Sequence, residues 1–461
     1  MAKIRAGLLP LYIKLYDDLI PSLRDRLEPF YQKIADRLER EGLEVLRTEF
    51  CRVESEFADV VQQFEQQGAD CIITLHMAYS PSLESVGVLT ETSLPIIVLD
   101  TTETFSFDFQ QNPDEINYNH GIHGVMDLCS LLRRNGKPYA ICAGHWQNSD
   151  VIGRAAGFAR AAKAAGALKG MRVGSCGGSF AGMGDFLVSG EELCQRFGAE
   201  LETADPAELC AIRDSVTEEE IEREMAHSRE RFEIPEPLDE TCFRLNTKAC
   251  LTVRKWAERH LLGAFSVNFL KVSPSAGLDS MPFTEACRAM EQGIGYAGEG
   301  DVLTAAFTGA LLQAFPESSF TEIFCPDWQN GNLFLSHMGE MNYRVAEEKP
   351  QLRGASFNYT DASAPVVGYA RFRGGKAVFL NISRGAKDFR AVVAPVEMLE
   401  TPPQVFTSSM RGWMRPSVGL PRFLEQLSQN GATHHSILIY GAEPEQMEFF
   451  AQLLGMEMVR I

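Results

Sequence analysis

The stretch KIRAGLLPLY (residues 3–12), followed by LRDRLEPFYQKIADRLEREG (residues 23–42), decides the fold class. The first is an apolar run of strand length, and the second carries apolar residues at helical spacing. The same alternation continues in LEVLRTEF (43–50), FADVVQQFEQQG (57–68), DCIITLH (70–76) and LPIIVLD (94–100). Strands that alternate with helices at this spacing predict βαβ units and a parallel sheet.

Ligands of parallel sheets collect beyond the carboxyl ends of the strands. Two of these ends are polar and contain a histidine: His76 in TLHMAYSPS and His145 in CAGHWQNSD. A binding role for the first third of the chain is therefore expected at this edge.

A second α/β unit begins with a strand at Met171–Gly174, which runs into the glycine-rich loop GSCGGSFAGMG. The charged segment DSVTEEEIEREMAHSRERF predicts a solvated helix with a capping box formed by Ser215 and Glu218. After about residue 355, alternating runs predict antiparallel strands, with a hairpin around Gly374-Gly375. We expect two Rossmann-like parallel-sheet α/β domains, residues 1–168 and 169–318, and a C-terminal antiparallel β-rich, barrel-like domain, residues 319–461.

Composition limits the possible partners. The chain has 461 residues, a formal net charge of −19 and a pI near 5.0, which disfavours nucleic acid and favours small ligands or cations. Its 11 cysteines form no CxxC pair and predict reduced, buried thiols. No signal peptide and no apolar run of roughly 20 residues is present. We expect a cytoplasmic protein with no membrane partner.

Two acidic stretches carry the candidate chemistry. GIGYAGEGDVLTAAF places Glu299 and Asp301 just before an apolar helical run, where acids also serve as ordinary helix caps. SSFTEIFCPDWQNGNLFLSHMGEMN has Glu322 inside an apolar strand and His337 at the end of another. A carboxylate in such a strand needs a partner, either a buried salt bridge or a metal ion.

The pair His434-His435, in GATHHSILIYG, precedes another apolar strand. One of these histidines, together with Glu299, Glu322 and His337, would supply two carboxylates and two imidazoles. This ligand set suits Mn²⁺, Co²⁺ or another first-row divalent ion with positions open to substrate oxygens. Because the ligands come from four separated segments, spacing alone does not establish the site.

These segments resemble the L-arabinose isomerase family, within the wider L-arabinose/L-fucose isomerase superfamily. The resembling motifs are GYAGEGD, SFTEIF, LSHMGE and GATHHS, and NHGIHG, AGHW, FARAAKAAGALKGMRVGSCGG and AFSVNF follow the family in the same order. The resemblance implies a metal, Mn²⁺ or a similar ion, on Glu299, Glu322, His337 and His435. It also implies that His123 and Phe269 contact the sugar.

The implied activity is aldose–ketose isomerisation through an enediolate, with Glu299 and Glu322 as acid and base and His434 facing the substrate or supporting the ligands. The resemblance further implies a homo-oligomer, a trimer or hexamer, in which a neighbour's N-terminal domain completes the site.

Two segments depart from the family. LLPLYIKLYDD stands where arabinose isomerases have a sugar-contacting GSQHLYG-like stretch, and Leu270 and Lys271 stand where they have acids. We therefore expect a sugar other than L-arabinose. Three alternatives stay open: a metal-dependent sugar epimerase, a non-catalytic sugar-binding protein, and a nucleotide-dependent oxidoreductase using the loop Cys176–Gly184.

Overall fold

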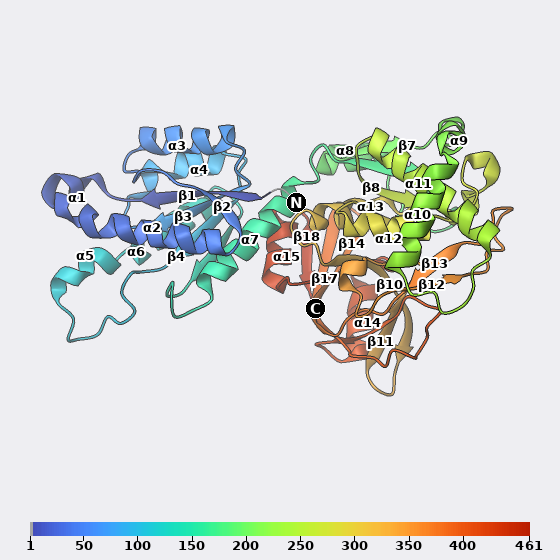
Figure 1. Cartoon of the computed structure of the whole chain (residues 1–461). Coiled ribbons are helices and arrows are strands. Elements are labelled where there is room, and N and C mark those ends of the chain that lie inside the picture. Colours follow the sequence, from blue (N-terminus) through green and yellow to red (C-terminus); the bar gives the residue numbers. More distant parts are fainter. Residues whose placement is uncertain (1–2) are drawn as a thin grey trace. The chain divides into compact units, whose positions relative to one another are not determined.

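The computed structural model describes residues 3–461, and the chain divides into two compact units, one ending at Gly166 and one from Ala167 to Ile461 (Figure 1). Among the described residues, no helix is both long enough and apolar enough to span a bilayer. Each unit is described separately below.

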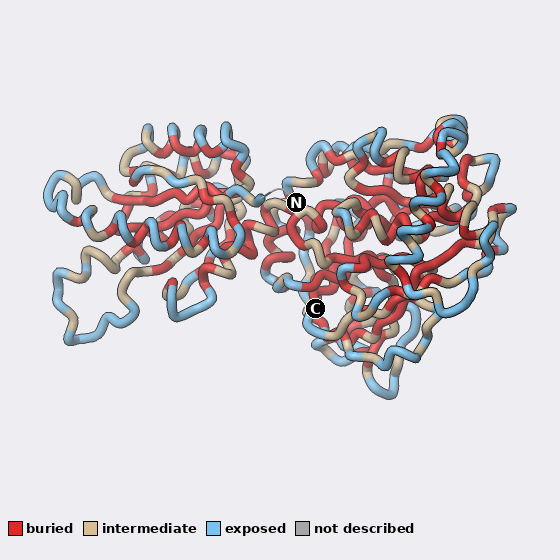
Figure 2. Tube along the Cα trace, in the orientation of Figure 1, coloured by how far each residue is buried: buried red, intermediate tan, exposed pale blue. Residues whose placement is uncertain are grey.

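The first unit is built on a five-stranded parallel sheet in the order β2-β1-β3-β4-β5. Its strands are β1 (Ile4–Leu11), β2 (Leu43–Leu46), β3 (Cys71–His76), β4 (Ile96–Asp100) and β5 (Tyr139–Ala143). Its helices are α1 (Lys14–Leu19), α2 (Arg24–Arg40), α3 (Glu54–Gln66), α4 (Val86–Glu91), α5 (Ile116–Asn119), α6 (Ile122–Arg134) and α7 (Val151–Gly166). Every residue of β3 is buried, because helices cover both faces of a parallel sheet (Figure 2).

The second unit begins with a four-stranded parallel sheet in the order β7-β6-β8-β9. Its strands are β6 (Arg172–Cys176), β7 (Glu200–Thr203), β8 (Leu262–Val267) and β9 (Gly295–Gly298). The helices of this part are α8 (Gly190–Phe197), α9 (Pro206–Ser215), α10 (Glu218–Arg231), α11 (Glu240–Arg259), α12 (Phe283–Glu291) and α13 (Val302–Leu312).

A closed barrel completes the second unit. Its order is β14-β17-β10-β11-β16-β15, and a direct β14–β15 pairing closes the ring with antiparallel neighbours throughout. The strands are β10 (Ser318–Asp327), β11 (Asn332–Ser336), β14 (Gly375–Arg384), β15 (Phe389–Met398), β16 (Gly412–Pro416) and β17 (His435–Tyr440). Outside the ring lie β12 (Gln351–Gly354) paired with β13 (Val366–Tyr369), β18 (Glu457–Arg460) beside β15, and helices α14 (Leu420–Gln429) and α15 (Pro444–Leu453). The predicted fold class, two parallel-sheet α/β regions followed by a barrel, is confirmed.

Helix α13 joins the parallel sheet to the barrel. All eleven of its residues are buried, as expected for a helix that is apolar on every side. It contacts β8 and β9 of the sheet and β10, β14 and β17 of the barrel. The amino end of α13 therefore lies where the carboxyl edge of the sheet meets the barrel.

Two local predictions were wrong. No hairpin forms around Gly374-Gly375, because β13 pairs with β12 whereas β14 pairs with β15 and β17. The alternating pattern located the strands but could not identify their partners. The capping box of α10 is formed by Thr217 and Glu220, not by Ser215 and Glu218. Ser215 instead ends α9, and its hydroxyl donates to the carbonyl of Ile212.

Candidate active site

Barrel register brings three of the predicted ligands together. Glu322 on β10 lies directly opposite His435, the first residue of β17. On the other side, Glu322 lies opposite Ser336, the last residue of β11, and His337 follows at once. Three neighbouring strands thus place Glu322, His337 and His435 at one end of the barrel.

Glu299 reaches the same place from the parallel sheet. It directly follows β9 and precedes α13, at the carboxyl edge where ligands of such sheets collect. His435 Nε2 lies 3.6 Å from Glu299 Oε2, and His337 Nε2 lies 3.9 Å from Glu322 Oε2. Possible ligand atoms fall into two groups within 4.8 Å, Glu322-His337-His435 and Glu299-His434-His435, which share His435. The four predicted ligands are neighbours but do not form one such group.

Each predicted ligand histidine has a buried carboxylate behind it. His337 Nδ1 donates to Glu340 Oε2 at 2.7 Å, and His435 Nδ1 donates to Asp301 Oδ2 at 2.9 Å. Because a carboxylate only accepts, these contacts leave each Nε2 to face the two glutamates. Nε2 of His435 is buried without a hydrogen-bond partner. Imidazoles oriented by a carboxylate on the far nitrogen are the usual arrangement of metal-binding histidines, so these residues fit a divalent ion.

The two supporting carboxylates are themselves held in place. Glu340 accepts from the Tyr296 hydroxyl at 2.9 Å and from the backbone N–H of Gly339 at 2.8 Å. Burial, followed by the charge of Glu340, raises the pKa of Tyr296 well above its usual value. Asp301 caps α13 by accepting from the backbone N–H of Thr304 at 2.8 Å. The helix cap expected from the sequence is therefore present, and the same carboxylate also orients His435.

The two glutamates differ in acidity. Burial raises the pKa of Glu322, and the nearby histidines only partly offset this. Burial alone would raise the pKa of Glu299 as well. A hydrogen bond with His434 and the charges of His435 and His337 outweigh this effect and lower the pKa of Glu299. Burial opposes the charge on His337, whereas Glu340 stabilises that charge and raises the pKa of His337. Two carboxylates with pKa values displaced in opposite directions suit one base and one acid.

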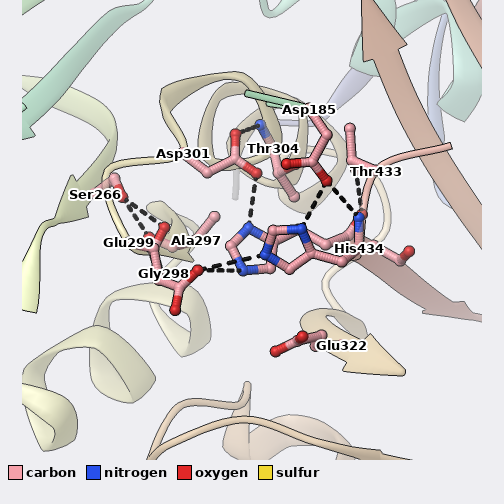
Figure 3. Close-up of polar contacts among 12 residues, drawn as sticks. Asp185, Ser266, Ala297, Gly298, Glu299, Asp301, Thr304, Glu322, Thr433 and His434 are labelled. Carbon is pink, nitrogen blue, oxygen red and sulfur yellow. Dashed lines mark hydrogen bonds and ion pairs between the residues drawn. The ribbon is translucent and has the colours of Figure 1, made fainter. Parts of the chain in front are cut away.

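His434 lies between two carboxylates (Figure 3). Its Nδ1 is 2.6 Å from Asp185 Oδ2, and its Nε2 is 3.4 Å from Glu299 Oε2. Burial would lower the pKa of His434, but the hydrogen bonds with Glu299 and Asp185 raise it to about 9. His434 is therefore cationic at neutral pH, beside Glu299.

Aromatic rings enclose the two predicted ligand histidines. Phe186 stacks on His435 with ring centroids 5.1 Å apart and planes at 10°. Phe320 presents its edge to His337 at 4.8 Å and to His435 at 4.9 Å. Both phenylalanines are fully buried. This apolar surround holds the imidazoles in place and strengthens the electrostatic interactions around them.

The backbone around Glu299 has an unusual conformation. Glu299 has φ 62°, in the left-handed region that costs a non-glycine residue roughly 1–2 kcal/mol. A Cβ on Gly298 would lie 2.5 Å from His337 Cε1, and a Cβ on Gly300 would lie 2.1 Å from the carbonyl oxygen of Gly178. The glycines flanking Glu299 therefore allow His337 and the glycine-rich loop to approach the site.

Of the predicted sugar contacts, Phe269 lies close to this site. It is in a short 3-10 turn after β8, and its ring lies 5.5 Å from that of Phe180 and 4.9 Å from that of Tyr359. The backbone N–H of Phe180 donates to the carbonyl of Glu299 at 2.9 Å. Phe269 is thus one aromatic ring away from the backbone of Glu299.

His123 belongs to the first unit, where it is exposed on α6 and stacks on Tyr79 with ring centroids 4.8 Å apart. His76 is buried with neither ring nitrogen hydrogen-bonded, and burial lowers its pKa to about 3. His145 instead supports its own turn, because its Nδ1 accepts from the backbone N–H groups of Gln147 and Asn148.

Sequence reasoning missed several residues that shape the site. Glu340 follows His337 by three residues in SHMGE, and a carboxylate so close to a predicted ligand was an available signal. Asp301 was expected only as a helix cap. Asp185 and Phe186 gave no local signal, because they are about 250 residues away from the histidines that they contact.

The chain is similar to known proteins over most of its length. Two family models match, the L-arabinose isomerase central domain over residues 190–314 and the L-arabinose isomerase C-terminal domain over residues 317–457. The L-arabinose isomerase of Aeromonas salmonicida is 24% identical over 412 residues, covering 86% of this chain and 81% of the relative. L-arabinose isomerase 1 of Bacillus licheniformis is 25% identical over 430 residues, covering 90% and 86%.

Proposed function

Because this chain belongs to the L-arabinose isomerase family, we propose that it is a metal-dependent aldose–ketose isomerase acting on a small sugar. The observation that carries the proposal is the pair of buried histidines, each held through Nδ1 by a carboxylate, with Nε2 facing two glutamates. A structural salt bridge would not require two imidazoles with such similar support.

The metal would be held by Glu299, Glu322, His337 and His435. Nitrogen and carboxylate ligands together suit Mn²⁺, Co²⁺ or a similar ion. When bound, such an ion polarises the sugar carbonyl and stabilises the enediolate that forms during isomerisation.

The protein groups would move the protons. With its pKa lowered, Glu299 is ionised at neutral pH and is the better base, whereas Glu322, with its pKa raised, is the better proton donor. His434 presents a cationic ring next to Glu299, suited to contact a sugar oxygen. Phe269 and Phe180 supply aromatic rings close to the backbone of Glu299.

The sugar is proposed to differ from L-arabinose, because LLPLYIKLYDD and the FSVNFLK segment differ from the family at positions that contact the substrate. A lost hydrogen-bond partner costs about 1 to 3 kcal/mol, so two such changes would lower activity by about two to four orders of magnitude.

The test is a panel of pentoses, hexoses, deoxy sugars and ketoses with saturating Mn²⁺, assayed for aldose–ketose and for epimer products. A best substrate other than L-arabinose supports the proposal. L-arabinose as the best substrate would refute the specificity argument, and epimers as the main products would favour an epimerase. No conversion of any sugar would contradict the enzymatic assignment.

We further propose a cytoplasmic homo-oligomer, a trimer or hexamer in which His123 of one copy serves the site of another. The support is an exposed apolar segment in the first unit, where Phe105, Phe107 and Phe109 are 69%, 52% and 96% exposed. Exposed apolar surface of this kind is typical of interaction sites. Sedimentation should show a trimer or hexamer, and a fully active monomer would contradict the proposal.

A further inference from the structure

The glycine-rich loop after β6 is attached to the candidate site by its backbone and by three side chains. The N–H of Phe180 donates to the carbonyl of Glu299 at 2.9 Å, and the Ser179 hydroxyl donates to the carbonyl of Gly300 at 3.3 Å. Further along the loop, Asp185 and Phe186 contact the histidine pair. The loop therefore contacts the candidate site from both ends.

Asp185 makes two contacts with the same residue. Its Oδ2 accepts from His434 Nδ1 at 2.6 Å and from the backbone N–H of His434 at 3.0 Å. Because a carboxylate cannot donate, Nδ1 of His434 carries a proton and Nε2 is directed at Glu299, whose Oε2 lies 3.4 Å away (Figure 3). The Phe186 ring, centred 5.4 Å from that of His434, packs against the imidazole.

Asp185 has a different role from the other supporting carboxylates. Asp301 and Glu340 accept hydrogen bonds from histidines of the proposed ligand set, whereas the side-chain hydrogen bonds of Asp185, among the described residues, both come from His434. A substitution at Asp185 therefore separates the orientation of His434 from metal binding.

We propose that Asp185 is a positioning residue, which fixes the ring orientation of His434 so that Nε2 faces Glu299 and the sugar. The proposal rests on the proposed function for its kinetic consequence, but the orientation of His434 can be measured without any turnover. The competing explanation is purely structural: Asp185 caps the backbone at the start of β17, and the imidazole contact has no further effect.

The variants are Asp185→Asn, which keeps an acceptor for the backbone N–H but removes the charge, and Asp185→Glu, which restores the charge on a longer side chain. Asp214→Asn is the matched control, because it makes the same chemical change at an exposed aspartate of α9 whose ion pair is with its neighbour Arg213. All variants are made in the full-length chain.

The first measurement is solid-state ¹⁵N NMR of histidine-labelled protein, with the signal of His434 assigned from a His434→Gln sample. We expect the Nδ1 signal of a protonated, carboxylate-bound nitrogen in the wild type and in Asp214→Asn, and a shifted signal in Asp185→Asn. An unchanged His434 signal in Asp185→Asn would overturn the proposal, whether or not the protein is an isomerase.

The second measurement pairs Mn²⁺ affinity with kinetics on the best sugar. We expect kcat of Asp185→Asn to fall by about 10- to 100-fold, the usual effect of removing an outer carboxylate, with Mn²⁺ affinity and KM within about threefold of wild type. Partial recovery of kcat in Asp185→Glu supports positioning. A parallel loss of Mn²⁺ affinity would show that Asp185 only maintains the start of β17 and would overturn the proposal. If the wild type converts no sugar, the proposed function fails and the NMR result alone decides the orientation.

Discussion

Asp301→Asn tests how strongly a buried carboxylate controls a ligand histidine. Asp301 and His435 are both fully buried, and the hydrogen bond between Oδ2 and Nδ1 is 2.9 Å. The other oxygen caps α13 through the N–H of Thr304 at 2.8 Å. Asparagine caps helices about as well as aspartate, so the substitution keeps the cap and changes only the contact with His435.

The expected magnitude follows from this geometry. If the new amide oxygen keeps the cap, the amide nitrogen faces Nδ1 of His435 and donates to it. The imidazole must then carry its proton on Nε2, the nitrogen that should bind the metal. Loss of such a support lowers metal affinity by 10- to 100-fold, or about 1.4 to 2.7 kcal/mol. We expect the upper end, because at a fully buried pair no water is available to accept the Nδ1 proton in place of the carboxylate.

The assay is calorimetric titration of Mn²⁺ into metal-free protein, with thermal unfolding of the same samples. Asp239→Asn is the matched control, because Asp239 caps α11 by the same contact, accepting from the N–H of Cys242 at 2.8 Å, and is exposed. We expect Mn²⁺ affinity to fall in Asp301→Asn only. Wild-type affinity in Asp301→Asn, with an unchanged unfolding temperature, would refute the assigned role of Asp301.

Three further predictions concern Glu322 and the surroundings of His337. Glu322→Gln removes a charged ligand and should lower Mn²⁺ affinity by more than the roughly 100-fold upper limit for an outer carboxylate; stoichiometric Mn²⁺ after dialysis would contradict this. Gly298→Ala places a Cβ 2.5 Å from His337 Cε1. Calorimetry should therefore show weaker Mn²⁺ binding, and the free energy of unfolding should fall by about 1–3 kcal/mol. Wild-type values of both would show that the His337 ring moves freely. Glu340 raises the pKa of His337 against the effect of burial. Because a proton on His337 competes with the metal, Mn²⁺ affinity should rise with pH, and in Glu340→Gln this rise should occur at lower pH. The same pH dependence of Mn²⁺ affinity in Glu340→Gln and the wild type would show that Glu340 does not control the protonation of His337.

Much of the fold was accessible from sequence. Buried strands such as β3 are rich in apolar residues, and their alternation with amphipathic helices predicts parallel sheets. Strand pairing in the barrel was less accessible. The alternation in β13 and β14 suggested a hairpin, but alternation reports which face of a strand is buried and not which strand lies beside it.

The residues of the candidate site were likewise only partly predictable from the sequence. Glu322 was proposed because its charge interrupts an apolar strand. Glu299, His337 and the histidine pair were proposed because they lie at the ends of apolar segments, and the family resemblance selected His435 from the pair. Their supporting residues depend on tertiary contacts. Asp185, for example, lies 249 positions from His434 in the sequence, and nothing in the glycine-rich loop beside it indicated a histidine partner.

The metal assignment can be tested most directly by anomalous diffraction from crystals of the wild-type protein soaked with Mn²⁺. We predict one strong anomalous peak per chain, bonded to Nε2 of His337 and of His435 and to carboxylate oxygens of Glu299 and Glu322. This result requires Glu299 to join the group formed by Glu322 and the two histidines. A peak elsewhere, or no peak at a Mn²⁺ concentration that supports sugar conversion, would contradict the assignment.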